Sequence, residues 1–188
     1  MRLTVSAVIS AVLLGGCLSS APKAPVNWTI EPKASTTFQA ASAKWGAARL
    51  AQVSVRAPYD GQRLAVLRPN GSIAFDSFNV FAAAPAALMR GAARDVAEGS
   101  GLFARVVQAS SSAAAPYALE VGVTRLALDC RTEGVRRAVC ELTVLLLNGR
   151  EVAGSSRGEG SQPVGGGDFS AAFSRAFTAA LSDALAKL

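Results

Sequence analysis

The stretch that decides the fold runs from Tyr117 to Gly154 and reads YALEVGVTRLALDCRTEGVRRAVCELTVLLLNGREVAG. Apolar residues alternate on odd positions up to Val123 and on even positions afterwards, which is typical of a half-buried strand with a β-bulge near Thr124-Arg125. A second run alternates on even positions from Ala138 to Leu146. The stretch therefore predicts a long antiparallel hairpin with one apolar face.

The register of this hairpin depends on where its turn is centred. With Glu133-Gly134 supplying the bend and the turn centred on Val135, three pairs of residues fall on one face. These pairs are Cys130 with Cys140, Leu128 with Leu142, and Leu126 with Val144.

Downstream, a second hairpin and a closing helix are expected. Asn148-Gly149 is the strongest short turn signal in the chain and leads into a Gly/Ser-rich strand that begins with Glu151–Ser155. Three glycines then lead to Asp168, a good N-cap residue. Apolar side chains recur every four residues after it, so we expect a helix that packs on the sheet. They are Phe169, Phe173, Phe177, Leu181 and Leu185.

Upstream, the pattern predicts one more helix and several strands. Pro85 suits the first turn of a helix that ends at Gly99-Ser100-Gly101. Phe103–Gln108 reads as a strand after it, and Asn27–Pro32 as a first edge strand. The other strands expected are Gln52–Arg56, Leu64–Arg68 and Ser72–Asp76. The fold class is therefore α+β: a mostly antiparallel, mixed β-sheet of about six strands with two amphipathic helices on one face, in a single domain over residues 27–188.

The N-terminus indicates an exported chain. Met1-Arg2 precedes the apolar run Val5–Leu14, which is too short to span a membrane and is typical of a signal peptide over residues 1–16. Leu14-Gly15-Gly16-Cys17 resembles the lipobox of bacterial lipoproteins, which implies lipid attachment at Cys17. The alternative is an ordinary signal peptide with a chance cysteine. Residues 17–26 are then the anchor and a short linker.

Composition excludes several classes of function. The 188 residues include no His, which rules out Ser-His-Asp and Cys-His catalysis and most catalytic zinc sites. Asp and Glu show no suggestive spacing, so we expect no catalytic set, no metal site and no cofactor. The formal charge of +6 is scattered, without the basic and aromatic clusters of nucleic-acid binders. A solvated basic surface is the simpler interpretation.

Two groups of residues stand out in the exported part. The periplasm permits a disulfide between Cys130 and Cys140, and two buried free thiols are the alternative. Arg131, Arg136 and Arg137 flank the hairpin tip and are candidates for contact with a partner or with lipid head groups; a merely solvated tip is the alternative.

The chain resembles the ABC-type transport auxiliary lipoproteins, the PqiC-like family. The resemblance begins at Asn27–Pro32, includes Leu64–Phe75 with its Gly turn, and ends with the Ala-rich helix Phe169–Leu185. It also covers a segment before the first helix in which many members carry Trp and this chain has Phe81, a further candidate contact residue.

The resemblance implies a non-enzymatic, periplasm-facing accessory of a lipid-transport system. Its partners would be an MCE-domain protein and an inner-membrane ABC permease and ATPase, with membrane lipid held through acylated Cys17. In this lipoprotein family Leu18 after the cysteine implies the outer membrane. The alternative is a structural envelope lipoprotein without a transport role, and an esterase-like enzyme ranks third.

Overall fold

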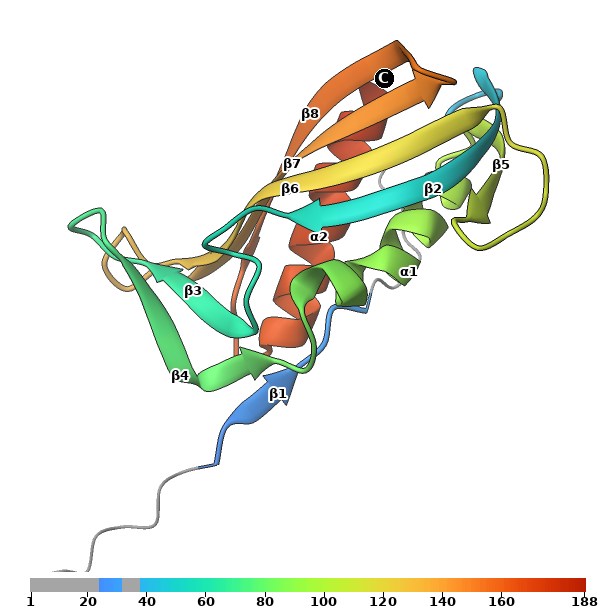
Figure 1. Cartoon of the computed structure of the whole chain (residues 1–188). Coiled ribbons are helices and arrows are strands. Elements are labelled where there is room, and N and C mark those ends of the chain that lie inside the picture. The colour runs from blue at the N-terminus through green and yellow to red at the C-terminus, as the bar shows by residue number, and fades with distance from the viewer. Residues whose placement is uncertain (1–23, 32–37) are drawn as a thin grey trace, which may run out of the picture.

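A computed structural model describes residues 24–31 and 38–188 (Figure 1). The predicted signal peptide and Cys17 lie outside the described residues. The predicted α+β class is confirmed: the described residues form two helices and a mixed sheet of eight strands. In chain order the elements are β1 Val26–Trp28, β2 Trp45–Val55, β3 Arg63–Leu67, β4 Ile73–Phe81, α1 Pro85–Gly99, β5 Phe103–Gln108, β6 Tyr117–Asp129, β7 Arg137–Asn148, β8 Glu151–Pro163 and α2 Phe169–Ala186.

Strand β6 is the centre of the sheet. On one side it pairs with β7, which pairs with β8. On the other side its first half pairs with β2 and its last two residues pair with β3, so β2 and β3 follow one another along the same edge. β5 extends the sheet beyond β2, and β4 and β1 extend it beyond β3.

The prediction of about six, mostly antiparallel strands is therefore wrong in detail. Four of the seven strand pairs are parallel: β1 with β4, β2 with β5, β2 with β6, and β3 with β6. The physical reason is that side chains alternate with a period of two in both kinds of pairing. Alternation shows which residues face the core, but it does not show which strand lies alongside.

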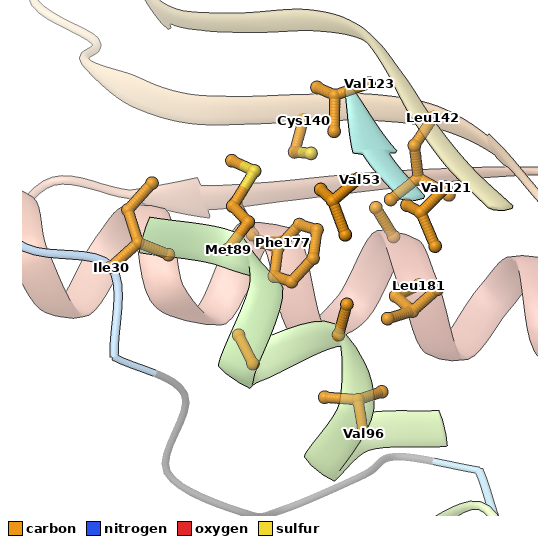
Figure 2. Close-up of a cluster of buried hydrophobic side chains, with 14 of the residues drawn as sticks. Ile30, Val53, Met89, Val96, Val121, Val123, Cys140, Leu142, Phe177 and Leu181 are labelled. Atoms are coloured by element: carbon orange, nitrogen blue, oxygen red, sulfur yellow. The ribbon is translucent and has the colours of Figure 1, made fainter. Parts of the chain in front are cut away.

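Both helices lie on one face of the sheet, as Figure 1 shows. Pro85 begins α1, and the Asp168 carboxylate caps α2 by accepting a hydrogen bond from the Ala171 N–H at 2.9 Å. The five predicted apolar residues of α2 are all buried. They join Met89 and Val96 of α1 and the inward side chains of β6 and β7 in one core. Figure 2 shows part of it, with Phe177 and Leu181 near Met89 and Val96.

Helix α2 lies unusually close to β8. A Cβ added at Gly160 would meet the Ala176 carbonyl oxygen at 1.9 Å, and one added at Gly158 would meet the Ala180 carbonyl oxygen at 1.9 Å. The glycines of the Gly/Ser-rich strand thus allow direct contact between the strand and the helix backbone. Asp183 of α2 also accepts a hydrogen bond from the Glu159 N–H at 3.2 Å, on the outer edge of β8.

The hairpin predicted from the deciding stretch is present, but its register is wrong. The bulge occurs between Val123 and Arg125, as expected. Cys140 lies opposite Leu126, however, and Leu128 lies opposite Ala138. The hairpin is centred on Glu133, two residues earlier than predicted. The Cys130 N–H donates to the Leu67 carbonyl at 3.0 Å, so Cys130 bonds to β3 and does not pair with β7.

The predicted Cys130–Cys140 disulfide is accordingly absent from the structure. Both cysteines are free; Cys140 is fully buried and Cys130 is half-buried. Burial raises the pKa of both thiols, and raises that of Cys140 well above its ordinary value. The alternative interpretation, two free thiols packed in or beside the core, describes the structure.

Candidate functional site

The face of the sheet opposite the helices carries the candidate site, and we call it the open face. Ala65, Leu67 and Ala127 form a small apolar cluster there, separate from the main core. Tyr59 and Val139 pack against this cluster and are only partly buried. No helix covers this face within the described residues.

A concave pocket of about 330 Å³ opens beside this cluster, at the bulge of β6. It is lined by Arg56 and Ala57 at the end of β2, Tyr59 of the following loop, Thr124 and Arg125 of the bulge, and Glu141 of β7. The extra residue of a bulge bends a strand and redirects its side chains, which accounts for the hollow at this point.

The pocket wall is held by a small polar network. The Arg125 guanidinium forms an ion pair with the Glu141 carboxylate across the β6–β7 pair. The Thr124 hydroxyl donates to the Glu141 carbonyl at 3.2 Å, and the Arg56 N–H donates to the Val123 carbonyl at 2.9 Å. The backbone is therefore fixed on both sides of the pocket, at the end of β2 and at the bulge of β6. The side chain of Arg56, which also lines the pocket, is exposed.

An apolar region continues from the pocket onto β3 and β4. Phe75 pairs with Ala65 and Ile73 pairs with Leu67, and paired residues project from the same face, so both lie on the open face. The Arg63 guanidinium lies over the Phe75 ring, 5.2 Å from its centroid. The open face thus combines an apolar floor and aromatic side chains with three arginines, Arg56, Arg63 and Arg125.

The predicted arginines of the hairpin tip are exposed but do not form one cluster of free charges. Arg131 forms an ion pair with Asp129 at 2.6 Å, and this hydrogen bond holds the pKa of the Asp129 carboxyl below its ordinary value. Arg137 donates to the Ser161 hydroxyl at 2.7 Å. Arg136 is exposed beside them, and its carbonyl accepts from the Val164 N–H at 2.9 Å.

Phe81 is not a surface residue, which corrects its selection as a contact candidate. It is 4% exposed and packs edge to face on Phe173 of α2, with ring centroids 5.5 Å apart. The parallel pairing of β1 with β4 places Trp28 next to Phe81 and closes the core at that end. Phe81 therefore joins sheet to helix.

The described residues contain no group of three or more His, Cys, Asp and Glu side chains that could hold a metal ion. None of the helices in the described part of the chain is long and apolar enough to cross a membrane. The arrangement on the open face is suited to binding, because an apolar floor next to guanidinium groups matches an amphiphilic surface.

Comparison with solved structures supports the architecture. Protein XCC0632 from Xanthomonas campestris, of the family DUF330, has a TM-score of 0.58 and 21% sequence identity, covering 86% of this chain and 88% of that one. An uncharacterised protein has a TM-score of 0.53 and 14% identity, covering 73% and 87%. These two proteins share the fold.

A PelC dodecamer from Paraburkholderia phytofirmans is more distant, with a TM-score of 0.41 and 17% identity over 79% of this chain and 95% of that one. No family model and no curated protein match the chain. The likeness therefore extends to the fold alone.

Sequence reasoning missed the pocket residues Arg56, Tyr59 and Glu141. They come from two segments far apart in the sequence, residues 56–59 and β7, and only the parallel pairing of β2 with β6 places the end of β2 beside the bulge. The phase slip at Thr124-Arg125 was the one signal that could have indicated the position, because bulges often occur next to functional sites.

Proposed function

We propose that this protein is a lipid-anchored, periplasm-facing accessory component of an ABC/MCE-type lipid-transport system, which acts by docking a partner and not by catalysis. The observation that carries the proposal is the open face, where a pocket with two arginines adjoins an apolar floor on the side of the sheet away from both helices. The lipobox-like sequence ending at Cys17 supports the anchor, and Leu18 supports the outer membrane.

The proposed partners are an MCE-domain protein and the inner-membrane ABC permease and ATPase. Confinement by the acyl chains on Cys17 would raise the effective concentration of the domain for a partner that arrives at the same membrane. The Arg125–Glu141 pair would fix the pocket rim, and Arg56 would contact an acidic group of the partner.

The test is affinity purification of the acylated protein from its own membranes, followed by mass spectrometry of the proteins and lipids that co-purify. Recovery of an MCE-domain protein or ABC subunits, and their loss in a mislocalised Cys17→Ala control, supports the proposal. Recovery of peptidoglycan-associated or other structural envelope proteins alone contradicts it and favours a structural lipoprotein.

A pair of charge reversals tests the open face separately. Arg56→Glu places an acid at the pocket mouth and should abolish recovery of the partner, because like charges at a docking surface repel. Arg150→Glu makes the same change in net charge at the exposed β7–β8 turn and should leave recovery unchanged. Equal recovery with both variants would exclude the pocket as the docking site.

A further inference from the structure

Strand β4 exposes three large apolar side chains within six residues. Ile73 and Phe75 are each 38% exposed and Phe78 is 51% exposed. Single exposed apolar residues are normal in soluble domains, whereas a contiguous group marks a contact surface. We call the segment from Arg63 to Phe81 the β3–β4 arm, and these three residues its apolar strip.

The backbone around Phe78 is held in place by specific hydrogen bonds. The Asp76 carboxylate accepts from the Phe78 N–H at 2.8 Å, and from the N–H and the side-chain amide of Asn79 at 3.0 and 2.7 Å. The side-chain Oδ1 of Asn79 in turn accepts from the Trp28 indole N–H at 3.0 Å. The exposure of Phe78 is thus part of an ordered structure that is bonded to β1.

The position of β1 connects the apolar strip with the N-terminus. β1 runs parallel to β4, with Val26 opposite Asn79, and Val26 itself is 42% exposed. Cys17 precedes Val26 by nine residues, and a chain of that length spans at most about 30 Å when fully extended. An anchor at Cys17 therefore holds the strip within reach of the bilayer.

We propose that the β3–β4 arm lies on the membrane that holds the anchor, with the apolar strip at the boundary between lipid head groups and acyl chains. This inference rests on the lipid anchor of the proposed function. Phe75 and Phe78 suit that depth, because Phe side chains on membrane-surface segments are buried at the boundary between head groups and acyl chains.

The charges on the arm agree with a lipid surface as the occupant. Arg63 lies over Phe75, and the exposed Arg68 precedes the β3–β4 turn; both can reach lipid phosphates while their stems contact apolar surface. The nearest acid on β4, Asp76, is hydrogen-bonded to Phe78 and Asn79. Two basic groups beside two aromatic rings is a combination that an anionic bilayer attracts.

The experiment uses the full processed chain, acylated in its host and reconstituted into vesicles of phosphatidylcholine and phosphatidylglycerol. The variant Phe78→Trp places a fluorescent tryptophan in the apolar strip. Val152→Trp is the matched control, since Val152 is 62% exposed but lies at the start of β8, opposite Leu147 and away from β3. Fluorescence is compared with and without lipid brominated in its acyl chains, after subtracting the emission of the wild-type protein with its native Trp28 and Trp45.

Brominated lipid should quench the added emission of Phe78→Trp at least about twofold and leave that of Val152→Trp unchanged. Equal quenching of both variants on vesicle-bound protein would overturn the inference and leave the anchor intact. A blue shift of Phe78→Trp without quenching would show that a protein surface, such as a second copy, covers the strip, and would also overturn it. Protein that fails to float with the vesicles would refute the anchor itself.

Discussion

At Gly160 the fold leaves no space for a side chain, because the backbone of α2 lies directly on β8. Gly160→Ala would place a methyl group 1.9 Å from the Ala176 carbonyl oxygen, so the helix must move. We expect the free energy of unfolding to fall by about 2–3 kcal/mol, as for other overpacked cores. Urea denaturation measures it.

Gly91 provides the matched control for this substitution. It lies inside α1, is exposed, and has no atom within 4 Å of the position a Cβ would take. Gly91→Ala should therefore stabilise the protein by about 0.5–1 kcal/mol through helix propensity. If Gly160→Ala did not lower the free energy of unfolding relative to Gly91→Ala, α2 could not lie directly on the backbone of β8.

The two cysteines of the domain should behave as free thiols of unequal access. Cys140 is fully buried with a raised pKa, so a thiol reagent at pH 8 should modify Cys130 first and Cys140 only after unfolding. Peptide mapping by mass spectrometry identifies the modified residue. The melting temperature should not change on addition of a reductant; a fall of several degrees would show that a disulfide forms after all.

Among the elements, β4 has an irregular part, where its register with β3 shifts between Arg63 and Ala65, and one carboxylate holds the backbone there. Burial raises the pKa of Asp76, but hydrogen bonds from Asn79 and Phe78 outweigh it, and the folded pKa lies below the ordinary value. Because the folded pKa is lowered, this stabilisation is present above about pH 4 and is lost as the pH falls through the folded value.

Asp76→Ala should therefore lower the free energy of unfolding by about 1 kcal/mol at pH 7. The difference from the wild type should shrink below about pH 4, where the wild-type carboxylate becomes protonated. Asp60→Ala, an exposed change in the β2–β3 loop, is the control and should have an effect within about 0.5 kcal/mol. Denaturation at a series of pH values checks both, and a constant difference down to pH 2 would contradict the role of Asp76.

Elements that depend on local signals could be predicted from the sequence, and those that depend on distant segments could not. Pro85 and Asp168 set the starts of both helices, and Asn148-Gly149 set the last hairpin, because caps and turns are local chemistry. The register of β6 with β7 was missed because Cys130 bonds to β3, more than sixty residues earlier. The pocket was missed for the same reason, since the parallel contact of β2 with β6 has no local signature.

At the scale of the whole molecule, the body and the β3–β4 arm differ in how they are held. β7 is paired along its full length on both sides and lies over α2. The arm joins β6 through only two residue pairs, Val66 with Leu128 and Leu67 with Asp129. Fewer shared hydrogen bonds and less buried apolar contact lower the free energy of local opening.

Hydrogen exchange should therefore separate the two regions. We expect amides of residues 73–78 to exchange at lower urea concentrations than those of Arg137–Asn148, because this part of the arm can open while the body stays folded. Exchange measured by mass spectrometry of peptides from the two strands decides this, and simultaneous opening of both would contradict it. A surface that opens independently can adjust to a bilayer without disturbing the core. Membrane contact should therefore slow amide exchange in the arm and leave amide exchange in β7 unchanged.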